Sequence, residues 1–127
     1  MAEIDYRTEK QPVARLTSPV ITIPKTGVTE ITVTMKNVNM TVTGIVYRAG
    51  DTSTDITRTL SIRDAYGAEY FSKASIADNA PTPLNALKST QDFAPFAING
   101  NLTIGVTPSA ADARSAAVSD YVDLLGV

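Results

Sequence analysis

Three residue types are missing from this sequence, and each absence removes a class of chemistry. The 127 residues include no cysteine, so the chain holds no disulfide, no thiolate metal site and no cysteine nucleophile. They include no histidine, which removes the usual general base and the commonest transition-metal ligand. Tryptophan is absent as well. Without a histidine or a suitably placed lysine, no serine or threonine is activated as a nucleophile. We therefore expect no enzyme activity, no cofactor and no metal site.

Long hydrophobic runs and a strong net charge are also missing. The longest apolar runs are only a few residues, too short for a membrane span. A net charge of −2 favours neither nucleic acid nor an anionic membrane as a partner. The first residues, MAEIDYRTEKQ, are charged and show no secretory signal. We expect a protein that is made in a cytoplasm and binds neither nucleic acid nor membrane.

The length and composition are those of one folded domain. A hydrophobic content of 43% is sufficient for a chain of 127 residues to bury a core without disulfides. The polar residues 1–12 precede the first strand signal, and we expect them to form a flexible or extended N-terminal arm. Residues 13–127 are then the folded domain.

Alternation of apolar and threonine-rich positions is the dominant pattern and predicts antiparallel strands. In 28–35, Ile31, Val33 and Met35 fall on one face, with Thr32 and Thr34 on the other. Similar signals occur at 19–24, 41–49, 56–63, 69–76, 101–107 and 118–125. The sequence therefore predicts an all-β fold: a single antiparallel β-sandwich of jelly-roll or Ig-like type, with seven or eight strands. The prolines that bracket 19–24 place that strand at an edge.

Turn signals separate these strands. They lie at 24–27, 36–39, 49–55, 64–67 and 98–101. Residues 77–97 contain three prolines and form the longest stretch without a strand pattern, which we expect to cross between the two sheets. The alanine-rich residues 108–118 fit one or two helical turns or a broad loop equally well.

The stretch IRDAYGAEYF, residues 62–71, holds an acid, an aromatic residue and a glycine in one short turn. Asp64 is suited to accept backbone N–H bonds at the start of the turn, and Gly67 to adopt the left-handed conformation that closes it. A structural corner accounts for both residues. Tyr66 at the tip is a candidate interface residue, since aromatic side chains are enriched in interfaces. Tyr6 and Arg7 in the arm are candidates of the same kind.

Acidic residues offer no convincing reactive pair. Asp120 and Asp123 fall on opposite faces of their predicted strand, so they do not form a carboxylate pair. Asp120 either points inward and pairs with an arginine such as Arg58, or reaches water near a strand end. The stretch DTSTD at 51–55 begins like a calcium loop, but isoleucine occupies the positions that require glycine and glutamate.

The C-terminal half resembles small β-sandwich virion proteins of tailed bacteriophages. The matching segments are ITRTLSIRDAYGAEYFSKASIA (56–77) and FAPFAINGNLTIGVTPS (93–109). Asp64 and Gly67 in the turn, together with Gly100 before a strand, carry the likeness. The resemblance implies a decoration (cement) protein that binds the outside of the assembled capsid, with the major capsid protein and copies of itself as partners. It also implies a location on the capsid surface of the virion.

Two other functions fit the same sequence. A phage neck or tail component belongs to the same structural class. A carbohydrate-binding β-sandwich module is a different class, and the scarcity of aromatic residues, 6% with no tryptophan, weighs against it.

Overall fold

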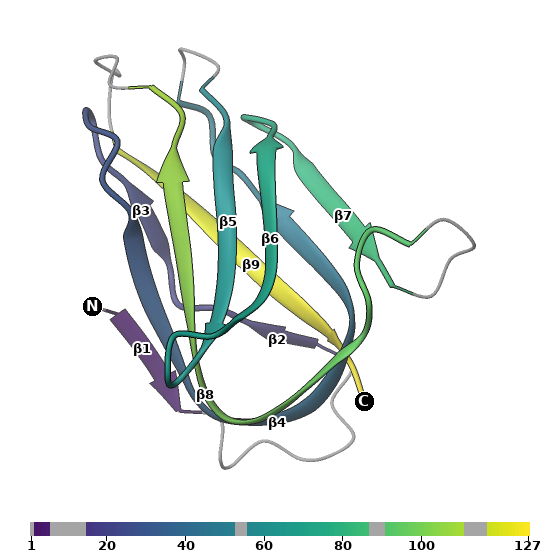
Figure 1. Ribbon diagram of the computed structural model, residues 1–127. Coiled ribbons are helices and arrows are strands. Elements are labelled where there is room, and N and C mark those ends of the chain that lie inside the picture. Colours follow the sequence, from purple (N-terminus) through teal and green to yellow (C-terminus); the bar gives the residue numbers. More distant parts are fainter. Residues whose placement is uncertain (1, 6–14, 53–55, 87–90, 111–116) are drawn as a thin grey trace.

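The computed structural model describes residues 2–5, 15–52, 56–86, 91–110 and 117–127, and these contain nine β-strands and no helix (Figure 1). The strands are β1 (Ala2–Asp5), β2 (Arg15–Thr17), β3 (Ile21–Ile23), β4 (Ile31–Arg48), β5 (Arg58–Asp64), β6 (Glu69–Ile76), β7 (Pro81–Asn85), β8 (Phe96–Pro108) and β9 (Val118–Gly126). The predicted all-β class is confirmed, with more strands than the expected seven or eight. No helix in the described ranges is long and apolar enough to cross a membrane.

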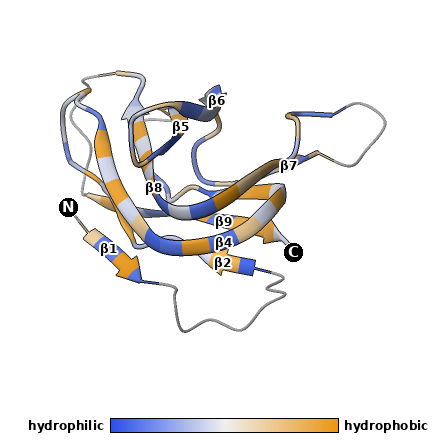
Figure 2. Cartoon of the chain, turned by 60° about the horizontal axis from the view of Figure 1, so that its bottom comes forward, coloured by the Kyte–Doolittle hydropathy of each residue, from blue (hydrophilic) through white to orange (hydrophobic). Residues whose placement is uncertain are grey.

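The strands form one open sheet that folds over itself. Its main path runs β2-β9-β4-β8-β5-β6, with β1 and β7 beside β4 and β3 beside β9. Pairing is antiparallel except between β1 and β4, which run parallel. The long strand β4 belongs to both halves: residues 31–42 pair with β8, and residues 42–48 pair with β9 and β7. The two halves thus curve toward each other like the layers of a sandwich (Figures 1 and 2).

A bend in two paired strands produces this curvature. Asn37 in β4 has a φ of 56° and Gly100 in β8 a φ of 135°. The β4–β8 register shifts between Met35 and Val38, and Val38 lies opposite Gly100. An extra residue in one strand bends it and increases its twist. The segments 36–39 and 98–101, predicted as turns, are therefore bends inside continuous strands, since each keeps its ladder partner.

The core lies between the two halves and follows the predicted alternation. Along β4 the apolar residues at alternate positions are buried, and the threonines between them are half-exposed. The same apolar face appears as orange bands on the curved strands in Figure 2. The charged residue Arg58 on β5 and Asp120 on β9 meet inside at 2.8 Å, although two strands separate β5 from β9 in the sheet. This contact shows that the two halves face each other.

Other segments differ from their predictions or extend them. Residues 77–97, expected to be irregular, contain the edge strand β7, which tolerates its prolines because it pairs only with β4. The chain does cross between the halves here, since β6 pairs with β5 and β7 pairs with β4. The predicted edge strand at 19–24 is β3, which pairs only with β9.

The arm and the alanine-rich segment are described only in part. Within the predicted arm 1–12, Ala2–Asp5 form β1 along β4, and all four residues are exposed. Residues 6–12 lie outside the described residues, so flexibility of the arm stays a prediction. In the segment 108–118, residues 111–116 lie outside the described part.

Candidate functional site

The turn between β5 and β6 is held by the side chain of Asp64. Its Oδ1 accepts hydrogen bonds from the backbone N–H groups of Tyr66 at 2.8 Å and Ala68 at 2.9 Å. The backbone carbonyl of Asp64 accepts a further bond from the N–H of Gly67 at 3.2 Å. Gly67 has a φ of 89°, a conformation that favours glycine because it has no Cβ. Asp64 and Gly67 thus occupy the structural positions that the sequence indicates, and Tyr66 is left at the tip, 96% exposed.

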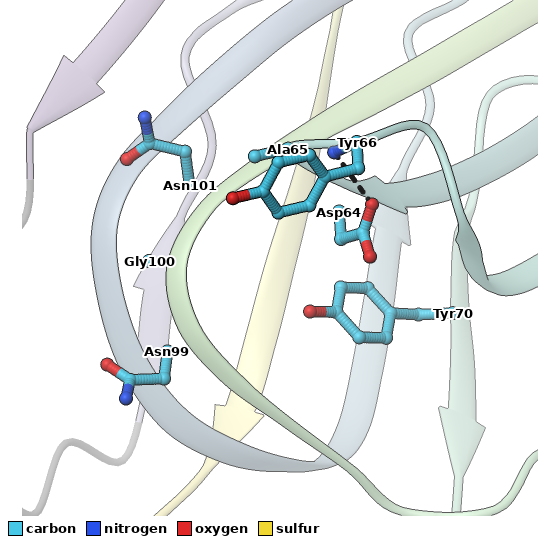
Figure 3. A pocket seen from close by; sticks show the side chains of 7 residues that line it. All are labelled: Asp64, Ala65, Tyr66, Tyr70, Asn99, Gly100 and Asn101. Atoms are coloured by element: carbon cyan, nitrogen blue, oxygen red, sulfur yellow. Dashed lines mark hydrogen bonds between the residues drawn. The ribbon is translucent and has the colours of Figure 1, made fainter.

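A pocket of about 350 Å³ opens beside this turn (Figure 3). It lies where β8 bends at Gly100: β5 ends at Asp64 opposite Leu102, so residues of β8 before 102 continue without β5 at their side. The lining residues come from the β5–β6 turn and from the bend of β8: Asp64, Ala65, Tyr66, Tyr70, Asn99, Gly100 and Asn101. Two tyrosines stand on one side of the pocket and two asparagines on the other.

The structure brings together three of the residues singled out in the sequence, namely Asp64, Tyr66 and Gly100. Gly67 belongs to the same turn, while Tyr6 and Arg7 lie outside the described residues. Sequence reasoning missed the asparagines and Tyr70. The available signal was the pair Asn99 and Asn101 at alternate positions around Gly100, which places both side chains toward one face of a strand.

An aromatic cluster forms the base of the pocket. Tyr70 stacks on Phe96 with ring centroids 5.0 Å apart and an interplanar angle of 10°. Phe93 packs against Phe96 at 5.8 Å and against Phe71 at 5.2 Å. Stacked and edge-to-face rings each add stabilisation beyond area burial. Tyr70 is therefore held in place by its neighbours, whereas Tyr66 has no such packing.

A second polar cluster lies in the core, around the guanidinium of Arg58. Nε and Nη2 of Arg58 donate to the carboxylate of Asp120 at 2.8 and 3.2 Å, and Nη1 donates to Asp78 Oδ1. The backbone carbonyls of Ile56 and Gly50, each at 3.0 Å, accept the remaining bonds. An arginine side chain has five N–H donors, and all five are used here. The predicted pairing of Arg58 with an inward-pointing Asp120 is confirmed.

The neighbours of this cluster satisfy its carboxylates as well. Asp120 accepts bonds from the Tyr47 hydroxyl at 2.6 Å and the Gly50 N–H at 2.8 Å. Asp78 accepts bonds from the Thr52 backbone N–H at 3.1 Å and hydroxyl at 2.8 Å. The cluster joins β4, β5 and β9 with the segments that follow β4 and β6. It thereby ties the two halves of the sheet together.

Burial and charge shift the pKa values of this cluster in opposite directions. Burial raises the pKa of Tyr47 far above its ordinary value, and the negative charge of Asp120 adds to the rise. Burial acts to lower the pKa of Arg58, but hydrogen bonds to Asp120 and Asp78 outweigh it and raise the pKa. Burial acts to raise the pKa of Asp78, but bonds from Arg58 and Thr52 outweigh it and lower the pKa. The cluster therefore holds a fixed charge state near neutral pH, which suits a structural role.

The outer face of β9 carries another ion-pair group. Asp123, 1% exposed, contacts Arg48 Nε at 3.1 Å and Arg15 at 3.8 Å and accepts a bond from the Thr17 hydroxyl at 2.7 Å. The guanidinium of Arg48 lies 5.0 Å from the centroid of the Tyr121 ring. Asp123 therefore faces away from the Arg58 cluster, in agreement with the predicted opposite faces of β9.

The described residues contain no group of three or more histidine, cysteine, aspartate or glutamate side chains arranged to hold a metal ion. In the segment 51–55, residues 53–55 lie outside the described part, and Thr52 is engaged with Asp78. Among the geometries described above, the pocket beside the β5–β6 turn is the one that offers side chains to a ligand.

The sequence matches no protein-family model and no curated protein. Three solved structures have similar arrangements of strands. One is PliG, a periplasmic inhibitor of g-type lysozyme from Salmonella Typhimurium, with 10% identity over 98% of this chain and 97% of that chain and a TM-score of 0.42. Another is a chain of the T13 IBDV viral particle, with 10% identity over 88% of this chain and 31% of that chain and a TM-score of 0.42. The third is a CBM4 structure, with 13% identity over 89% of this chain and 80% of that chain and a TM-score of 0.40. These likenesses agree with an all-β sandwich and do not bear on function.

Proposed function

We propose that this protein is a non-enzymatic component of a tailed-phage virion, a decoration protein that binds the outside of the assembled capsid and stabilises it. The proposal starts from the resemblance of residues 56–77 and 93–109 to small β-sandwich virion proteins. The turn held by Asp64 and Gly67 and the bend at Gly100 are formed in the structure by the residues that carry that resemblance.

The N-terminal strand is the observation that supports the proposal best. β1 pairs with β4 over four residues, from Ala2 opposite Val33 to Asp5 opposite Lys36, and none of its residues is buried. Its attachment consists of backbone bonds and a few surface contacts, such as Lys36 with Glu3 at 3.6 Å. Such a strand detaches at low cost and can pair with the sheet edge of a neighbouring chain. A lattice of capsid proteins presents many copies of such edges, so weak contacts add up.

The rigidity of the domain is suited to the same role. The Arg58 cluster ties the two halves of the sheet, and the core around it is continuous from β3 to β9. A rigid body loses little conformational entropy when it binds, so more of the contact free energy remains as affinity. We propose the major capsid protein and further copies of this chain as partners.

The copy number of the chain in purified particles of the virus that encodes it tests this proposal. We expect quantitative mass spectrometry against the major capsid protein to find hundreds of copies, as a lattice-bound protein requires. About a dozen copies would instead assign the chain to the neck or tail. Absence from the particle would refute a virion role altogether.

Deletion of residues 1–5 tests the proposed use of β1. We expect the shortened chain to keep its melting temperature within a few degrees, because β1 buries no side chain. Binding to assembled heads should be lost or strongly weakened. A matched control is Val28→Ala, which changes another exposed apolar residue outside β1. Unchanged head binding by the deleted chain would contradict the role of β1 but not the copy number.

A further inference from the structure

The pocket beside the β5–β6 turn has features of a ligand site that the decoration role does not require. It is built by two constrained backbones. Asp64 Oδ1 holds the turn through two N–H groups, and Gly100 in the left-handed region of φ bends β8 away from it. A Cβ built on Gly100 meets no atom within 4 Å, so this glycine is required by the backbone conformation and not by crowding. The pocket is thus present in the protein before any ligand binds.

The aromatic side chains give the pocket an apolar surface. Tyr70 is fixed by stacking on Phe96, and Tyr66 is 96% exposed at the tip of the turn. A large aromatic ring kept in water at a rigid turn adds nothing to the stability of the fold, which makes it an informative exposed residue. Figure 3 shows both tyrosine rings beside the pocket, with their hydroxyl groups directed toward β8.

The polar side chains add hydrogen-bonding groups opposite these rings. The Asn37 backbone N–H donates to Asn101 Oδ1 at 3.0 Å, which orients the Asn101 amide and leaves its NH₂ group available. Asp64 Oδ2 and the Asn99 amide have no hydrogen-bond partner among the described residues. The pocket therefore offers amide donors and acceptors and one carboxylate oxygen.

The charge of the pocket restricts its ligand. Asp64 is its single charged lining residue, so no cation is present to bind a phosphate, sulfate or carboxylate. A volume of about 350 Å³ lies at the lower end of the usual range for ligand pockets, roughly 300–1,000 Å³. The ligand is thus small, uncharged and rich in hydrogen-bonding groups, with one apolar face for the tyrosines.

A sugar ring has this combination of properties. One face of a pyranose presents C–H groups, which pack on the negative face of an aromatic ring. Its hydroxyl groups both donate and accept hydrogen bonds, as the asparagine amides and the Asp64 carboxylate require. From this geometry we infer that the pocket lined by Asp64, Tyr66, Tyr70, Asn99 and Asn101 binds one neutral sugar unit of a glycan. Tyr66 packs on the ring, and the asparagines and Asp64 bind its hydroxyls.

The experiment is a titration of the isotope-labelled full chain with neutral sugars, followed by the backbone amide signals in NMR spectra. The probes are glucose, galactose, mannose, N-acetylglucosamine, maltose and cellobiose. At least one of them should give saturable shifts centred on Ala65, Tyr66, Gly100 and Asn101. Choline chloride serves as a cationic comparison, since tyrosines beside a carboxylate also suit a quaternary ammonium group.

Two substitutions and one control make the test specific. Tyr66→Ala should weaken sugar binding about three- to tenfold, the loss of one aromatic contact, without change in folding because the side chain is exposed. Asn99→Ala should weaken it about two- to tenfold, the loss of a hydrogen bond. Asn39→Ala is the matched control, since Asn39 is an exposed asparagine directly opposite Asn99 on β4 but outside the pocket.

The inference is overturned if no sugar gives saturable shifts at roughly 100 mM, far above the weakest useful affinities. It is also overturned if the shifts lie away from the pocket, if Asn39→Ala weakens binding as much as Asn99→Ala, or if choline alone binds. These outcomes concern the isolated chain, so they are independent of the copy number in virus particles.

Discussion

Replacement of Arg58 by methionine is the sharpest test of how the two halves of the sheet are held together. Arg58 is 0% exposed and donates hydrogen bonds to Asp120, Asp78 and two backbone carbonyls. Methionine has a similar length and no donor, so the change removes the charge and all five bonds while leaving little empty space. Two carboxylates then remain buried without their cation.

The expected loss follows from those unpaired carboxylates. Removal of one partner of a buried ion pair costs about 3–5 kcal/mol, because the remaining charge is uncompensated. Asp120 keeps its bonds from Tyr47 and Gly50, and Asp78 keeps those from Thr52, so the cost does not rise above this range. For a domain whose unfolding free energy is about 5–15 kcal/mol, this is a large part of the total.

Urea denaturation followed by far-ultraviolet circular dichroism measures this loss. Arg63→Met is the matched control. Arg63 lies on the same strand and makes two bonds to Glu30, at 2.9 and 3.0 Å, but its side chain is 26% exposed and that of Glu30 36%. An exposed pair contributes about 0–1 kcal/mol, so the control should lose no more than that. Arg58→Lys, which keeps the charge without the five-donor fork, should fall between the two.

The pH dependence of the variant gives an independent check. In Arg58→Met, acid protonates the unpaired carboxylates and removes the buried charge, so the difference from the unchanged protein should shrink below pH of about 4. If Arg58→Met loses no more than Arg63→Met at neutral pH, the reasoning that the core cluster ties the halves together is refuted.

Two further predictions concern acid stability and close backbone contacts. The pKa of Asp78 is lowered from its ordinary value of 3.8, so its ionised form contributes stability that is present above about pH 4 and is lost as the pH falls through the lowered pKa. Asp78→Asn should therefore flatten the acid side of the stability curve measured by urea denaturation, and an unchanged slope would contradict the shift. A Cβ at Gly126 would lie 1.9 Å from the backbone oxygen of Thr41, whereas one at Gly105 meets the movable end of Glu30 at 2.2 Å. Thermal unfolding should show Gly126→Ala losing about 1–3 kcal/mol and Gly105→Ala markedly less, and equal losses would contradict the difference in contacts.

The sequence predicts those features that depend on local pattern. Alternation of apolar and threonine residues places the strands because side chains on a strand point to opposite faces in turn. The same alternation puts Arg58 and Asp120 on apolar faces, which is why their pairing was foreseeable. Asp78 was not foreseeable as their partner, because it lies in a segment with no periodic pattern. The segments around Asn37 and Gly100 signal turns, and only a partner strand distinguishes a bend from a turn.

The sequence by itself thus determined an all-β chain without histidine or cysteine chemistry, its strand faces and the turn held by Asp64 and Gly67. Each of these depends on residues close together in the chain. The tertiary structure decided how β4 passes from one half of the sheet to the other, which charges meet in the core, and that the tip of the β5–β6 turn stands beside the asparagines of β8. Those features join residues 30 or more positions apart, such as Tyr66 and Asn99, and the distance between such residues is set by strand register and bending.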